Sequence, residues 1–269
     1  MEPLPDIMQR LAARLGVHAA QFKSPEDYPS AFGVSYLNQA VNLHKALCLP
    51  VMGLLLIHSV WNADVRQGTG SAARGIEDIA ARHAVYAAMH ATYGLLWVVK
   101  AYCFPDHGFF IKLSAPLWLF CFAMGNIHWI TAWLALSSPA QKYDEWLILV
   151  ALIIYVVGVF LLFTSDCQKY FFMQLRNPAN KQLMQDGLFA RCRNPNYLGE
   201  ILIYSAFATL ARHVLPWAIL AAYTSGLFLP NMLEKDRSLA RYPDFSAYKA
   251  RSGMLIPRVF QPGESKRSK

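Results

Sequence analysis

The chain has 269 residues, of which 55% are hydrophobic and only 16% are charged. Soluble domains usually carry about 25% charged residues, so this composition leaves too little polar surface for a water-facing globule and also excludes disordered, collagen-like and disulfide-rich proteins. A net charge of +8 in so apolar a chain favours an anionic membrane surface or a phosphorylated ligand over nucleic acid. The sequence therefore predicts an all-α integral membrane protein.

A polar N-terminal segment, which lacks the apolar core of a secretory signal, precedes four apolar segments of membrane-spanning length at 36–61, 83–103, 116–137 and 146–163. Two further apolar segments, 197–211 and 214–233, are joined through Arg212 and His213 and indicate a helical hairpin. We expect six spans, with room for a seventh inside the first segment or around 104–119.

Basic residues gather in the stretch 164–196 and in the tail that follows the hairpin. A two-helix hairpin returns both regions to the same side of the membrane, and the positive-inside rule makes that side cytoplasmic. Four earlier spans would place the N-terminus on this side too, whereas a fifth would place it outside.

Cysteine and histidine spacing gives no support for a disulfide framework or a metal site. The five cysteines are odd in number and lack CxxC spacing, and the histidines lack HExxH spacing. We therefore expect no metal and interpret the cysteines as reduced packing residues.

The second apolar segment carries Tyr86, His90 and Tyr93, whose spacing of four and three residues places them on one helix face. Polar side chains are costly in a membrane and usually face a cavity, so this face is a candidate source of proton donors. The alternative is hydrogen bonding between neighbouring helices.

The densest group of polar residues follows the fourth segment. Residues 165–169 read Ser-Asp-Cys-Gln-Lys, Arg176 and Arg191 follow, and Arg193 then begins the run Arg-Asn-Pro-Asn-Tyr-Leu-Gly-Glu. Cations and amides at a helix start suit an anionic ligand, particularly a phosphate. The alternative is a basic belt that binds anionic lipid headgroups.

The run from Arg193 to Glu200 resembles the R-H-P-N-Y-x-G-E signature of a membrane superfamily containing steroid 5-alpha-reductases, sterol C14 reductases and isoprenylcysteine carboxyl methyltransferases, with Asn194 in place of His. The R-x-P-N-Y-x-G-E core is common to its reductases and methyltransferases. The segment from Ser165 to Arg176 and the tail from Arg241 to Pro257 resemble the reductases, so the combination favours a steroid 5-alpha-reductase type of enzyme.

The resemblance implies that helices in 1–163 enclose a hydrophobic substrate and that 164–269 hold NADPH. The cofactor contacts that it implies are Asp166, Lys169, Arg176, Arg193, Asn196, Tyr197, Glu200, Asn231 and Glu234. Cations would suit the phosphates of the dinucleotide, and carboxylates or amides would suit its ribose and nicotinamide.

The resemblance also implies a reaction: NADPH-dependent reduction of a conjugated C=C bond in a 3-oxo-Δ4 steroid or similar lipid enone. A short F-L-Q-E segment of the reductases is similar to residues 36–39, which places Gln39 where their catalytic Glu stands. Tyr93, with His90 beside it, is the first choice for the catalytic tyrosine, and Tyr86 is the alternative. Because Gln supplies no proton at neutral pH, protonation would fall to Tyr, His or water.

Two other functions are compatible with the sequence. An S-adenosylmethionine-dependent methyltransferase would use the same turn at 193–200, although its cofactor has no phosphates to explain the nearby cations. A non-catalytic protein that binds sterols or other lipids would bind no nucleotide tightly. In each case the expected partners are a hydrophobic ligand and membrane lipids, with no nucleic acid and no obligatory protein partner.

Overall fold

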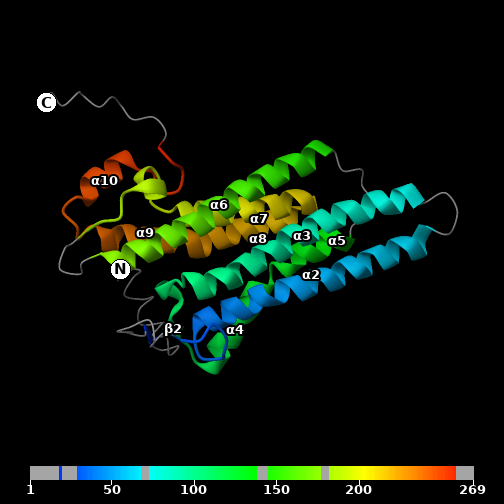
Figure 1. Ribbon diagram of the computed structural model, residues 1–269, viewed down its shortest axis with the longest axis horizontal. Helices are drawn as coiled ribbons and strands as arrows, with labels where there is room; N and C mark the ends of the chain where they lie inside the picture. The colour runs from blue at the N-terminus through cyan, green and yellow to red at the C-terminus, as the bar shows by residue number, and fades with distance from the viewer. Residues whose placement is uncertain (1–17, 20–28, 68–72, 138–144, 177–181, 259–269) are drawn as a thin grey trace, which may run out of the picture. The chain divides into compact units, whose positions relative to one another are not determined.

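A computed structural model describes residues 18–19, 29–67, 73–137, 145–176 and 182–258 (Figure 1). The predicted polar N-terminal segment lies outside these ranges apart from its last residues and His18 and Ala19, which form strand β1. The chain divides into two compact units, Met1–Lys142 and Tyr143–Lys269. Residue 163, after which the sequence predicts a division between a substrate-enclosing and a cofactor-binding part, lies inside the helix Glu145–Leu175 of the second unit, and that functional division stays a prediction.

Unit 1 is built on two long helices, α2 (Leu37–Gln67) and α3 (Ala73–Cys103), which lie side by side (Figure 1). At Gly94 of α3 a Cβ atom would lie 2.6 Å from the Cβ atom of Cys48 and would also strike the carbonyl oxygen of Lys45. A glycine therefore permits this close approach of the two backbones, a common device between membrane helices.

Two shorter helices, α4 (Ala115–Asn126) and α5 (Trp129–Ser137), pack against α2. At the α2 N-terminus, β1 (His18–Ala19) pairs antiparallel with β2 (Ile111–Lys112), and a small core of Ala40, Leu113 and Trp118 fills the space beside them. A 3-10 turn, His107–Phe109, connects α3 to β2, and the carboxylate of Asp106 accepts a hydrogen bond from the amide of Gly108 at 2.9 Å.

Unit 2 contains α6 (Glu145–Leu175), a 3-10 turn (Gly187–Ala190), α7 (Pro195–Ala211), α8 (Val214–Tyr223), a π-helical turn (Thr224–Phe228), α9 (Leu229–Leu239) and α10 (Phe245–Arg251). A Cβ atom on Gly199 of α7 would lie 2.6 Å from the carbonyl oxygen of Gly158, so α6 and α7 pack backbone to backbone. The glycine of the sequence motif is thus a packing residue.

The predicted helical hairpin in unit 2 is confirmed at its break. Helix α7 ends at Ala211, Arg212 takes a left-handed conformation with φ of 48°, and the ring of His213 accepts a hydrogen bond from the amide of Leu215 at 3.0 Å to cap α8. The fourth apolar segment, in contrast, extends further than predicted: α6 continues as a helix through the polar residues after 163 to Leu175.

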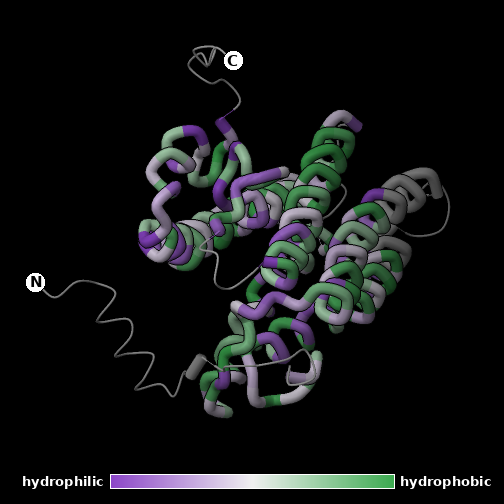
Figure 2. Tube along the Cα trace, turned by 60° about the vertical axis from the view of Figure 1, so that its left-hand side comes forward, coloured by the Kyte–Doolittle hydropathy of each residue, from purple (hydrophilic) through white to green (hydrophobic). Residues whose placement is uncertain are grey.

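The described residues include three helical stretches that are long and apolar enough to cross a membrane, Leu37–Asn62, Ala115–Ser137 and Glu145–Leu175. Figure 2 shows hydrophobic residues along the helices, with hydrophilic residues interspersed among them. On α6 the side chains of Ile153, Val156 and Phe160 are exposed, as expected for a surface that faces lipid. The all-α class is therefore confirmed, and three membrane-spanning stretches are supported by length and composition.

Candidate functional site

The predicted catalytic face of α3 is buried inside unit 1. Tyr86, His90 and Tyr93 are each at most 2% exposed, and the Tyr86 hydroxyl lies 3.3 Å from Nδ1 of His90. Tyr93 packs edge-on against Trp97, one turn further along α3, with ring centroids 6.2 Å apart. The three side chains therefore face the interior of unit 1.

A buried cation meets this face from α2. The ammonium of Lys45 lies 3.9 Å from the centroid of the Tyr93 ring and 5.2 Å from that of Trp97. An ammonium above an aromatic face is attracted by the ring quadrupole, and this attraction is larger when the pair is desolvated. Sequence reasoning missed Lys45 as a partner of Tyr93, although a lysine inside an apolar helix is itself a signal of a polar interior.

Neutral hydrogen bonds complete the polar interior of unit 1. The indole of Trp97 donates to Oδ1 of Asn42 at 3.1 Å, and Nδ1 of His44 lies 2.7 Å from Oδ1 of Asn126. Each contact joins α2 to another helix. This is the interhelical bonding that was the alternative to a catalytic role for such residues.

Gln39 has a clear structural role at the start of α2. Its Oε1 accepts hydrogen bonds from the backbone amides of Ser35 and Tyr36 at 2.9 and 3.1 Å, and its Nε2 donates to the carbonyl of Ser30 at 3.2 Å. This is the glutamine half of a capping box, with Gln39 three residues after the N-cap position. Sequence reasoning missed it because Tyr36, rather than Ser or Thr, occupies that N-cap. The catalytic role of Gln39 stays a prediction.

In unit 2, the motif residue Arg193 forms the centre of an internal clamp. Its Nε and Nη2 donate to the two carboxylate oxygens of Asp236 at 2.9 Å each, and its Nη1 donates to the carbonyl of Ser252 at 2.6 Å. Arg193 is 5% exposed, so this bidentate pair is largely removed from water. We call Arg193, Asp236 and Ser252 the arginine clamp.

Asn194, which stands where the resembled signature has His, extends the clamp. It is fully buried; its Nδ2 donates to the carbonyl of Met254 at 2.8 Å and its Oδ1 accepts from the ammonium of Lys235 at 3.0 Å. Lys235 also donates to the carbonyl of Arg193 at 2.8 Å. The amide thus supplies one donor and one acceptor inside the fold, which a single imidazole tautomer also offers.

The backbone around the clamp is tied to the C-terminal tail. The amide of Arg193 donates to the carbonyl of Gly253 at 2.8 Å, and the amide of Gly253 donates to the carbonyl of Arg191 at 2.9 Å. The thiol of Cys192 donates to the carbonyl of Leu255 at 3.0 Å, and burial raises the pKa of this thiol. Cys192 is therefore a protonated packing residue, in agreement with the interpretation of the cysteines from the sequence, although it lies inside the motif.

The predicted cofactor contacts that follow the clamp on α7 are less buried than Arg193 and Asn194. Asn196, in the first turn of α7, is half-buried, and its Oδ1 is shielded from solvent yet accepts no hydrogen bond from any described residue. Tyr197 packs on Phe228 with ring centroids 5.0 Å apart, and Glu200 is half-buried one turn after Asn196. Asn196 and Glu200, four residues apart, share one face of α7.

Helix α6 carries two further predicted cofactor contacts, Asp166 and Lys169, near the start of α7. Gly158 packs on both Gly199 and Ile203 of α7, whereas Leu162, one turn later on α6, reaches Gly199. The two helices therefore run antiparallel, and Asp166, one further turn along α6, lies near the start of α7. Asp166 is buried, whereas Lys169 is half-buried one turn beyond it.

The remaining predicted contacts lie nearer the surface. Arg176 is half-buried at the end of α6; hydrogen bonds from Arg241 and from Arg176 lower the pKa of Tyr242. Asn231 and Glu234 are exposed on α9, where Glu234 pairs with Arg237 at 3.3 Å. The predicted cofactor residues therefore separate into an inner group and an outer group. The inner group consists of Asp166, Lys169, Arg193, Asn196, Tyr197 and Glu200, and the outer group of Arg176, Asn231 and Glu234.

Comparison with known proteins gives one family. Residues 54–252, which cover most of the chain, match the family described as "Protein of unknown function (DUF1295)". No curated protein matches the chain. The matched range includes the whole of α3, α6 and α7 and ends at Ser252 of the arginine clamp. The chain belongs to the DUF1295 family.

Proposed function

We propose that the protein is an NADPH-dependent membrane oxidoreductase of the steroid 5-alpha-reductase type. It reduces the C=C bond of a 3-oxo-Δ4 steroid or a similar lipid enone. In this proposal the chain crosses the membrane six or seven times and the cofactor-binding loops face the cytoplasm. The proposal is supported by the Arg193–Glu200 motif, by the flanking segments that resemble the reductases, and by the three helical stretches that are long and apolar enough to cross a membrane.

The observation that carries the proposal is the side-chain oxygen of Asn196. A buried acceptor without a hydrogen bond is costly, and such groups in native proteins usually have a partner that the protein itself does not supply. Among the described residues no donor reaches this oxygen, whereas both the side-chain oxygen and the side-chain nitrogen of the neighbouring Asn194 form hydrogen bonds. A ligand with amide or hydroxyl donors at the start of α7 would satisfy Asn196.

NADPH fits the residues around this position. Its carboxamide and ribose hydroxyls offer donors for Asn196, Asp166 and Glu200, and Lys169 and Arg176 offer cations for its phosphates. The arginine clamp is a positioning element in this arrangement, because its guanidinium donates to Asp236 and Ser252 and thereby holds the turn that presents Asn196. When bound, NADPH supplies a hydride for the β-carbon of the enone.

The buried face of unit 1 supplies the groups for the substrate carbonyl. Tyr93 and His90 carry protons in an environment shielded from water, where a donor aimed at developing charge has its largest effect. Because the amide of Gln39 is engaged in capping α2, we assign the proton that follows the hydride to the Tyr93 hydroxyl, with His90 as the second candidate.

The test is cofactor titration of the purified full-length protein in detergent, with Asn196→Ala compared with Asn194→Ala. Asn196→Ala should weaken NADPH binding about tenfold while leaving the melting temperature unchanged or raised, since it removes an unsatisfied buried acceptor. Asn194→Ala should lower the melting temperature, since it breaks bonds within the fold. Binding of S-adenosylmethionine without NADPH would instead favour the methyltransferase, and binding of neither would favour the lipid-binding protein.

A further inference from the structure

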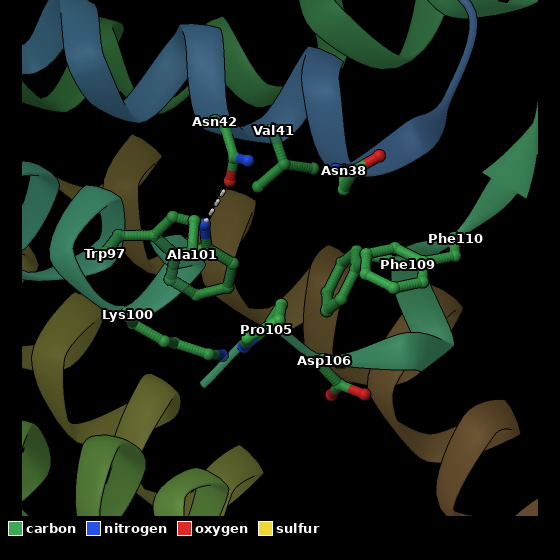
Figure 3. A pocket seen from close by; sticks show the side chains of 10 residues that line it. All are labelled: Asn38, Val41, Asn42, Trp97, Lys100, Ala101, Pro105, Asp106, Phe109 and Phe110. Carbon is green, nitrogen blue, oxygen red and sulfur yellow. Dashed lines mark hydrogen bonds between the residues drawn. The ribbon is translucent and has the colours of Figure 1, made fainter. Parts of the chain in front are cut away.

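Two buried lysines lie beside aromatic rings in unit 1, Lys45 on α2 and Lys100 on α3. Lys45 is 4% exposed and Lys100 is 3% exposed. Figure 3 shows Lys100 beside Trp97, and its ammonium lies 4.3 Å from the centroid of that ring. A charge inside an apolar helix is costly, so such residues usually have a function. The reaction proposed above uses neither lysine.

The backbone holds Lys45 at the level of Tyr93. Gly94, the next residue along α3, has no side chain, and a Cβ atom at this position would strike the carbonyl oxygen of Lys45. The glycine therefore lets the α2 backbone at Lys45 lie directly against α3. The side chain of Lys45 places its ammonium over the Tyr93 ring, 3.9 Å from the ring centroid.

Trp97 supports both partners of this contact. Its ring plane lies at 84° to that of Tyr93, and the Lys45 ammonium lies 5.2 Å from its centroid. The indole is itself held in place, because it donates to Asn42 at 3.1 Å (Figure 3) and packs edge-on against Phe109 with ring centroids 6.0 Å apart. The position of the cation beside Tyr93 is therefore built into the packing of α2 and α3.

This geometry gives Lys45 an electrostatic effect on proton donation by Tyr93. In the proposed reaction hydride adds to the β-carbon of the enone, and the electrons of the C=C bond form an enolate. The O–H bond of Tyr93 then breaks as its proton passes to the enolate, and solvent later returns a proton to the tyrosinate. A tyrosinate shares its negative charge between its oxygen and its ring, so an ammonium over the ring attracts it. Because this charge develops only during the reaction, the attraction lowers the barrier more than it strengthens substrate binding.

We propose that Lys45 is a positioning residue that acts through Tyr93, by stabilising the tyrosinate that forms when Tyr93 donates its proton. The inference rests on the proposed function and adds a second residue to its proton-transfer step. The alternative is that the cation only holds α2 and α3 together through its contacts with the aromatic rings. The experiment separates these two roles.

The experiment measures NADPH-dependent turnover of testosterone, a 3-oxo-Δ4 steroid, by the purified full-length protein in detergent. Lys45→Met should lower turnover per folded molecule about tenfold with unchanged NADPH affinity, whereas Lys45→Arg should keep most of it, because the guanidinium retains the charge and stacks on aromatic rings. In a Tyr93→Phe background Lys45→Met should cause no further loss, since its effect requires the Tyr93 hydroxyl. Replacing H2O by D2O should slow Lys45→Met more than the parent, because proton transfer has become slower.

Lys100→Met is the matched control, since it removes a second buried lysine from beside Trp97, two turns beyond Tyr93 on α3. Its turnover per folded molecule should equal that of the parent. The proposed role of Lys45 would be overturned by equal losses in Lys45→Met and Lys100→Met, by equal losses in Lys45→Met and Lys45→Arg, or by an undiminished loss in the Tyr93→Phe background.

Two further outcomes concern the alternatives. A lower melting temperature of Lys45→Met with turnover per folded molecule retained would assign the lysine to helix packing and reject its role in proton transfer. A parent protein that reduces no testosterone would reject the proposed reductase and the role of Lys45 with it, whereas an active parent with an equally active Lys45→Met would reject the role of Lys45 alone.

Discussion

In unit 1 several hydrogen bonds between neutral side chains each join one pair of neighbouring helices, whereas in unit 2 one guanidinium joins three segments that are distant in sequence. The contacts between Trp97 and Asn42 and between His44 and Asn126 are of the first kind. Arg193 is of the second, with Asp236 at a separation of 43 residues and Ser252 at a separation of 59. Loss of a neutral bond leaves a polar group that can find another partner, but loss of Arg193 leaves a buried carboxylate.

The largest expected effect is therefore at the arginine clamp. Arg193→Met should lower the free energy of unfolding by about 3–5 kcal/mol, because Asp236 then stays buried without its main partner. Thermal melting in detergent measures the loss. The matched control is Arg237→Met, which removes an ion pair whose side chains are 59% and 60% exposed and should cost at most about 1 kcal/mol. Equal costs for the two variants would contradict the structural role of the clamp.

The second effect tests a feature that the two units share. Gly94→Ala in unit 1 and Gly199→Ala in unit 2 should each cost about 1–3 kcal/mol, because the added methyl group meets the neighbouring helix at a distance that no side chain tolerates. Gly53→Ala in α2, where nothing lies within 4 Å of the new methyl group, serves as the control and should be neutral or stabilising. If all three variants melt alike, the helices are not in close backbone contact.

A smaller effect is expected for the hydrogen bonds of unit 1. A double-mutant cycle of Asn42→Leu and Trp97→Phe should give a coupling energy of about 0.6 kcal/mol, the average for such bonds between membrane helices. The same cycle applied to Arg193 and Asp236 should give a larger coupling energy. Equal coupling energies would show that the neutral hydrogen bonds of unit 1 are as strong as the charged clamp of unit 2, which contradicts the comparison.

The smallest effect concerns pH. Burial raises the pKa of the Cys192 thiol above its ordinary value near 9, so the folded state keeps its proton while the unfolded chain loses it. The contribution of Cys192 to stability should be complete below pH 9 and decrease as the pH rises from there through the raised pKa. Melting curves at pH 7 to 10 check this: the parent should lose more stability than Cys192→Ser across the alkaline part of the range, and parallel curves would exclude a buried thiol.

Local patterns in the sequence were sufficient to predict much of the helical framework. The apolar runs located the main helices, Pro195 marked the start of α7 at its first helical position, and Arg212 and His213 marked the break before α8. The extension of α6 to Leu175 was missed, because Ser165 and Asp166 resemble a helix end in hydropathy although they are buried against the rest of unit 2.

The sequence was sufficient to predict which residues form the candidate site in unit 2, but not which of them bond within the fold. The sequence correctly placed Arg193 and Asn194 in a turn before a helix that carries Asn196. The partners Asp236 and Ser252 lie too far along the chain for any local pattern to pair them with Arg193. Only the contacts separate Asn194, which is fully bonded, from Asn196, whose side-chain oxygen accepts no bond among the described residues.

The measurement that tests the proposed reductase most directly is isotope transfer to an enone. The purified full-length protein is incubated with testosterone and NADPH deuterated at the transferable position of its nicotinamide, and the steroid is analysed by mass spectrometry. We predict a saturated ketone with one deuterium on the former β-carbon and a solvent-derived proton on the α-carbon, formed more slowly by Tyr93→Phe. Unchanged testosterone, together with tight binding of S-adenosylmethionine in place of NADPH, would contradict the proposal.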